Sequence, residues 1–146
     1  MYSGFAGANN EALYSMSAGV GYYVIDQLSL NVEGAGYYVD QDGPDAGMAE
    51  FRLLMRHHLI VRDRWTLFAD VGFGISEASD QVPDDGTRMN FMFRAGAGAT
   101  YELRDNLYLI AGVRYFHLSN AKIEGDDRNP SINGIEGYVG VMWTMK

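Results

Sequence analysis

Residues 12–25 read ALYSMSAGVGYYVI, and this stretch indicates the fold because its character alternates with a period of two. Its even positions carry alanine, tyrosine, methionine and valine, whereas serine and glycine fill most of its odd positions. Successive side chains of a β-strand point to opposite faces. The alternation therefore predicts a strand with one apolar face and one small or polar face.

The same alternation recurs along the chain, whereas stretches with a capped helical period are absent. It predicts strands over residues 2–7, 12–25, 28–40, 48–61, 65–76, 88–101, 107–119 and 133–145. The connections at 26–27, 62–64 and 104–106 are short, whereas those at 41–47, 77–87 and 121–132 are longer and polar. Short turns at one end and longer loops at the other are typical of an outer-membrane barrel. We predict an all-β fold: an eight-stranded antiparallel transmembrane β-barrel of the outer membrane, formed by residues 1–146 as a single domain.

The composition narrows the class of protein further. The chain has 146 residues, 18 glycines, no cysteine and a net charge of −8, and the negative charge argues against a nucleic-acid partner. Its mean hydropathy is −0.16, and no apolar run approaches the ~18 residues that a membrane helix needs. No cationic and apolar signal segment opens the chain, so we expect a mature form from which a signal peptide has been removed.

Charged residues on the small or polar face of the predicted strands help to distinguish a barrel from a sandwich. Four acids and four bases occupy this face: Glu33, Glu50, Asp70, Glu136, Arg52, Arg56, Arg94 and Arg114. The interior of an eight-stranded barrel is only wide enough for side chains, and buried charges there must pair. The equal numbers of acidic and basic residues favour a membrane barrel, in which they can pair. A two-sheet sandwich and a soluble lipocalin-like barrel, with the apolar face inward, stay open as alternatives.

Residues 117–121 read HLSNA at the outer end of a predicted strand. Period two places His117 and Ser119 on the same face as Leu109 and Val113, which is the lipid face of a membrane barrel. A serine needs a neighbouring base to become nucleophilic near neutral pH, and two residues on one strand face are close enough to provide it. The alternative is that both side chains simply lie at the level of the lipid headgroups.

The HLSNA motif, a short polar loop, Asn129-Pro130 and a last glycine-rich strand together resemble the lipid A 3-O-deacylase (PagL-type) family. The resemblance is close over about 30 residues, and the family implies an outer-membrane serine esterase that removes the acyl chain at position 3 of lipid A. It implies that Ser119 is the nucleophile, His117 the general base and Asn120 part of the oxyanion hole. Neither a cofactor nor a metal ion is implied.

The residue that would orient the histidine departs from the family pattern. The family usually places an acid a few residues after the Asn-Pro pair, and Asn133 occupies that position here. Its parity places Asn133 on the outward face, where it can meet His117, and an asparagine can accept a hydrogen bond from an imidazole. Glu136 is the nearest acid and the alternative third member, but its parity points inward, which favours a structural ion pair with the arginines.

The resemblance also suggests a substrate and its contacts. The partners would be lipopolysaccharide, through its lipid A in the outer leaflet, and membrane lipid, with Lys122 and Arg128 placed to contact headgroup phosphates. A homodimer is left open. The His57-His58 pair does not indicate a metal site, because adjacent strand residues face opposite sides. The rival functions are a non-catalytic family member, a structural outer-membrane barrel and a soluble lipocalin-like lipid carrier.

Overall fold

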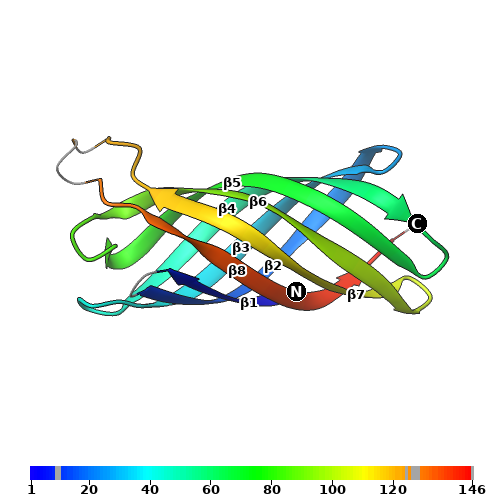
Figure 1. Ribbon diagram of the computed structural model, residues 1–146, viewed down its shortest axis with the longest axis horizontal. Coiled ribbons are helices and arrows are strands. Elements are labelled where there is room, and N and C mark those ends of the chain that lie inside the picture. Colours follow the sequence, from blue (N-terminus) through cyan, green and yellow to red (C-terminus); the bar gives the residue numbers. More distant parts are fainter. Residues whose placement is uncertain (9–10, 124, 126–128, 146) are drawn as a thin grey trace.

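The computed structural model describes residues 1–8, 11–123, 125 and 129–145 and consists of antiparallel strands with turns and loops between them (Figure 1). The described strands are β1 (Tyr2–Ala8), β2 (Glu11–Ile25), β3 (Leu28–Asp40), β4 (Ala46–Val61), β5 (Trp65–Val82), β6 (Thr87–Arg104), β7 (Leu107–Ser119) and β8 (Ile132–Trp143). No helix among these residues is long and apolar enough to cross a bilayer.

The strands form one closed barrel in sequence order. Each strand pairs with its neighbours in the chain, and β1 closes the sheet by pairing with β8, where Gly4 lies opposite Tyr138. Closure gives each strand two hydrogen-bonded neighbours, and the short β1 pairs with β2 over residues 11–17. The prediction of an all-β antiparallel barrel is therefore confirmed.

One loop is shorter than the sequence analysis expected. Residues 77–87 were expected to be a loop, but β5 continues to Val82 and β6 begins at Thr87. The strand extends because its alternation continues past the expected end: Ala78 and Val82 are buried inside the barrel. Arg88 holds the extension by donating from Nε to the backbone oxygen of Ala78 at 2.8 Å.

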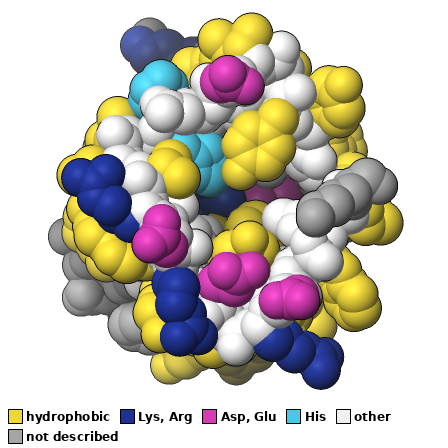
Figure 2. Space-filling model, turned by 90° about the vertical axis from the view of Figure 1, so that its right-hand side faces the viewer, with side chains coloured by type: hydrophobic (Ala, Val, Ile, Leu, Met, Phe, Trp, Pro, Cys, Tyr) yellow, Lys and Arg dark blue, Asp and Glu magenta, His cyan; other side chains and the backbone are white. Residues whose placement is uncertain are grey.

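The outer surface of the barrel wall is apolar. Along β4, buried side chains alternate with exposed ones, and the exposed set includes Phe51, Leu53 and Met55. Exposed apolar side chains on β2, β3 and β5–β8 extend this surface into the apolar belt that a bilayer requires. Figure 2 shows that the end with the short turns has a different character: acidic and basic side chains surround a hollow mouth.

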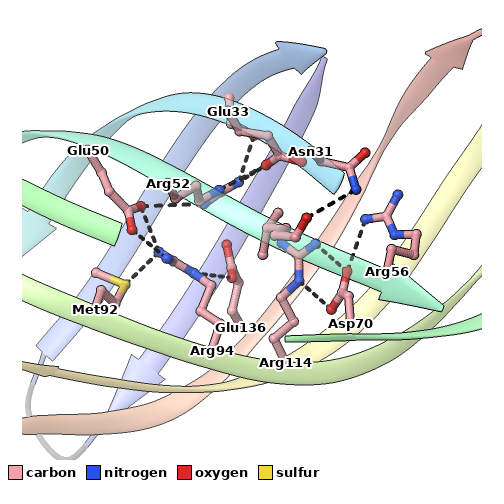
Figure 3. Close-up of polar contacts among 12 residues, drawn as sticks. Asn31, Glu33, Glu50, Arg52, Arg56, Asp70, Met92, Arg94, Arg114 and Glu136 are labelled. Carbon is pink, nitrogen blue, oxygen red and sulfur yellow. Dashed lines mark hydrogen bonds and ion pairs between the residues drawn. The ribbon is translucent and has the colours of Figure 1, made fainter. Parts of the chain in front are cut away.

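The middle of the lumen is filled by ion pairs (Figure 3). The pairs join all eight charged residues predicted to face inward: Arg52–Glu33, Arg52–Glu50, Arg94–Glu50, Arg94–Glu136, Arg56–Asp70 and Arg114–Asp70. All eight are at least 95% buried. The predicted pairing is confirmed, and a lumen filled with charge does not suit a soluble carrier of apolar ligands.

An apolar layer closes the lumen on the side of the longer loops. Its members are Leu13, Ala35, Tyr37, Val39, Ala46, Met48, Ala78, Val82, Met92, Phe116, Leu118 and Ile132. Phe116 and Leu118 alternate along β7 with His117 and Ser119, and Ile132 precedes Asn133 in β8. The buried residues therefore anchor from inside the two strand ends that carry the candidate site outside.

Candidate active site on the lipid-facing side of the barrel

A serine and a histidine meet at the loop end of β7. His117 and Ser119 project from the same outward face, as the sequence predicted, and His117 Nε2 lies 3.2 Å from Ser119 Oγ. Ser119 is 8% exposed, whereas His117 is partly exposed. A hydroxyl within hydrogen-bond distance of an imidazole nitrogen is the arrangement that nucleophilic catalysis by serine requires.

Asn133 completes a chain of polar atoms with this pair. It is the register partner of His117 across β7 and β8, and its Oδ1 lies 2.8 Å from His117 Nδ1. A carbonyl oxygen only accepts hydrogen bonds, so in this geometry Nδ1 carries the imidazole proton and Nε2 is the acceptor facing Ser119. The atoms thus run in the order Ser119 Oγ, His117 Nε2, His117 Nδ1 and Asn133 Oδ1.

Glu136 lies on the other face of β8. It is 4% exposed, points into the lumen and accepts a hydrogen bond from Arg94 Nε at 3.3 Å. The barrel wall separates its carboxylate from His117, in agreement with the parity argument from the sequence.

Asn120 begins the turn that follows β7. It is 3% exposed, and its Oδ1 accepts a hydrogen bond from the backbone N–H of Lys122 at 2.9 Å. The backbone N–H of Asn120 donates to Asn129 Oδ1 at 3.1 Å. Ala121 and Lys122 both adopt the left-handed region, with φ of 53° and 63°, which is unfavourable for residues with a Cβ and is typical of functional sites.

A groove on the outer face leads to the serine. It has a volume of about 320 Å³ and is lined by Phe73, Phe91, Phe93, His117, Ser119 and Ala121. The rings of Phe73 and Phe91 stack with centroids 5.6 Å apart, and the register places Phe91 opposite Ser119. The groove lies on the lipid side of the wall, so an apolar chain can enter it from the bilayer.

The sequence analysis missed several residues of this site. It did not assign Tyr115 to the site, yet the Tyr115 hydroxyl donates to Asn133 Oδ1 at 2.6 Å. It also overlooked Ser131, whose Oγ accepts from Asn133 Nδ2 at 3.3 Å, and the phenylalanines of the groove. The parity of Tyr115, two residues before His117, was the available signal.

Lys122 and Arg128 are the two residues predicted to contact the lipid headgroup. Lys122 is exposed in the turn beside the site. Arg128 lies outside the described residues. Within the described part of the chain, no three His, Cys, Asp or Glu residues are grouped so that they could hold a metal ion.

The closed barrel and the polar chain on its lipid face define a class: a bacterial outer-membrane barrel with an esterase-like site on its outer wall. The family model of lipid A 3-O-deacylase (PagL) matches residues 14–142, and the chain belongs to that family, an esterase-type group of hydrolases that act on lipid A in the outer membrane.

Two solved structures share the fold. The outer membrane enzyme PagL superposes with a TM-score of 0.67 at 19% identity, covering 99% of this chain and 100% of that one. Neisserial surface protein A superposes with a TM-score of 0.69 at 16% identity, covering 99% and 92% of the two chains. A search of curated proteins finds no match. These findings place the chain in the bacterial outer membrane, and they do not support the homodimer that the sequence left open.

Proposed function

We propose that this protein is a serine esterase that hydrolyses the ester-linked acyl chain at position 3 of lipid A. One observation carries the proposal: Ser119 Oγ, the imidazole of His117 and Asn133 Oδ1 form a continuous polar chain on the lipid-facing wall, with separations of 3.2 and 2.8 Å. Family membership supports the substrate class, because the family is described as lipid A 3-O-deacylase.

The reaction begins when Ser119 Oγ attacks the ester carbonyl carbon. His117 Nε2 accepts the serine proton as the new bond forms, and Nδ1–H of the resulting imidazolium remains bonded to Asn133 Oδ1. The carbonyl oxygen becomes an oxyanion in the tetrahedral intermediate. Collapse expels the sugar alkoxide, which takes the proton from His117, and leaves an acyl-serine.

Water completes the reaction. His117 Nε2 removes a proton from a water molecule, the hydroxide attacks the acyl carbon, and Ser119 Oγ leaves with the proton returned by the imidazolium. The products are a free fatty acid and the 3-hydroxyl group of lipid A, and no further reactant is needed.

Asn120 is proposed to stabilise the oxyanion. Its Oδ1 accepts from the N–H of Lys122, and this contact orients the amide. The other end of the amide, Nδ2, is the donor that would stabilise the developing charge. Lys122, which is exposed beside the site, and Arg128, which lies outside the described residues, are proposed to contact the phosphates of the substrate.

The aromatic groove suits the acyl chain. Phe73, Phe91 and Phe93 offer an apolar wall that ends at Ser119, so a chain held along it places its ester at the nucleophile. The substrate would reach the groove by lateral diffusion in the membrane.

The proposal is tested by incubating the refolded protein with lipopolysaccharide in mixed micelles. Release of 3-hydroxy fatty acid, together with the matching mass loss of lipid A, is the expected result, and Ser119→Ala is the inactive control. Folded wild-type protein that releases no fatty acid from several lipid A types would favour a non-catalytic family member instead.

A further inference from the structure

The amide of Asn133 is held at both of its ends. Its Oδ1 accepts from the Tyr115 hydroxyl at 2.6 Å and faces His117 Nδ1 at 2.8 Å. Its Nδ2 donates to Ser131 Oγ at 3.3 Å. All four residues lie in β7, in β8 or immediately before β8, so the strand pairing fixes their relative positions.

The direction of this amide decides which nitrogen of His117 carries the proton, whereas turning a carboxylate over would change nothing. A carboxylate presents two equivalent acceptor oxygens, whereas an amide has one acceptor end and one donor end of nearly the same shape. If the Asn133 amide turned over, Nδ2 would face His117 Nδ1, and this nitrogen would have to act as the acceptor. The imidazole proton would then sit on Nε2, which could no longer accept the proton of Ser119.

Tyr115 favours the productive direction. A phenol is a stronger hydrogen-bond donor than acceptor, because its oxygen lone pair is delocalised into the ring. The side chain is 43% exposed on the outer wall, and Asn133 Oδ1 accepts its proton at 2.6 Å. Turning the amide over would leave the Tyr115 proton without Oδ1 and would offer the phenol only a donor.

We propose that Tyr115 is a positioning residue: its hydroxyl holds Asn133 Oδ1 toward His117 and thereby keeps the imidazole proton on Nδ1, so that Nε2 faces Ser119 as a base. This inference rests on the proposed esterase function. An asparagine that orients the histidine must be held with its oxygen toward the ring. An aspartate or glutamate in the same place needs no such contact, because its two oxygens are equivalent.

The kinetic test is a double-mutant comparison. Tyr115→Phe removes one oxygen and keeps the ring, and we expect it to lower kcat about fivefold to tenfold with little change in KM. In the Asn133→Asp background, the same substitution is expected to change kcat less than about twofold, because a carboxylate has no wrong direction. Tyr22→Phe is the matched control, since Tyr22 is exposed on the same outer wall in β2 and lies outside the site.

A second measurement does not depend on activity. The chain has three histidines, so ¹⁵N-histidine spectra in detergent micelles can be assigned with His117→Gln, at a pH at which the imidazole is neutral. Wild-type protein should show His117 with its proton on Nδ1, and Tyr115→Phe should show a mixture of the two tautomers.

The outcomes separate this proposal from the proposed function. An inactive wild-type protein would refute the esterase function, and the spectra alone would then judge the role of Tyr115. An equal loss of kcat in both backgrounds, no loss in either, or an unchanged tautomer in Tyr115→Phe would overturn the positioning role.

Discussion

Asn133 and Glu136 lie on opposite faces of β8. Asn133 faces the outside of the barrel and meets His117 Nδ1, whereas Glu136 faces the lumen and accepts from Arg94. Successive side chains of a strand point to opposite faces, so these two residues, three positions apart, lie on opposite sides of the barrel wall. One belongs to the candidate site and the other to the charged interior.

Removal of the nucleophile or the base should abolish activity. Ser119→Ala and His117→Ala are each expected to lower kcat by several powers of ten, because the two groups act as a unit. The barrel should still fold, since both side chains lie on the outer wall. His57→Ala is the control for loss of an exposed histidine from that wall, and fatty-acid release from lipopolysaccharide is the assay. Substantial activity in Ser119→Ala would exclude Ser119 as the nucleophile.

A carboxylate at position 133 should support the imidazolium at least as well as the amide does. Asn133→Asp is expected to keep or raise kcat, because a negative charge beside Nδ1–H stabilises the protonated ring. Asn133→Ala should lower kcat, because the ring loses the acceptor that orients it. Steady-state kinetics in mixed micelles measures both changes, and an unchanged rate in Asn133→Ala would show that this contact is not used.

Two substitutions of Asn120 separate its structural and chemical contributions. Asn120→Asp keeps an oxygen for the N–H of Lys122 but removes the Nδ2 donor, and Asn120→Ala removes both. If Nδ2 stabilises the oxyanion, both variants should lose kcat on the order of 10²-fold. Their unfolding temperatures should differ, with Asp closer to the wild type. Full activity in folded Asn120→Asp would exclude the oxyanion role.

Glu136→Gln should affect stability more than turnover. The substitution leaves the buried Arg94 guanidinium with a weaker acceptor, which costs about 1–3 kcal/mol of folding free energy. Glu77→Gln is the matched control, because Glu77 pairs with Arg88 at 3.8 Å on the exposed surface, where little change is expected. Circular dichroism in detergent gives the unfolding temperatures. If folded Glu136→Gln were as inactive as Ser119→Ala, Glu136 would be the catalytic acid.

The groove should determine how well an acyl chain is held. Phe73→Ala removes one ring of the stacked pair, and the lost apolar contact is expected to lower kcat/KM about tenfold. Phe51→Ala is the control, because Phe51 is exposed on the outer wall but does not line the groove. Lipid A substrates with shorter and longer acyl chains should reveal a changed preference in Phe73→Ala only. Equal effects of the two substitutions would argue against acyl binding in the groove.

The sequence by itself determined the strands, because a period of two is a local property that each strand carries in its own residues, and it favoured a membrane barrel over a sandwich. The same parity assigned His117, Ser119 and Asn133 to the outer face and Glu136 to the inner one. It also placed the eight charged residues in the lumen, although it could not say which acid pairs with which arginine.

Only the tertiary structure decided which atoms meet across neighbouring strands. Register brings His117 opposite Asn133 and Phe91 opposite Ser119, and register depends on how the closed sheet packs as a whole. The sequence therefore did not assign Tyr115 to the site and did not reveal the aromatic groove. Both depend on side chains from separate strands, and their distances exist only once the barrel has closed.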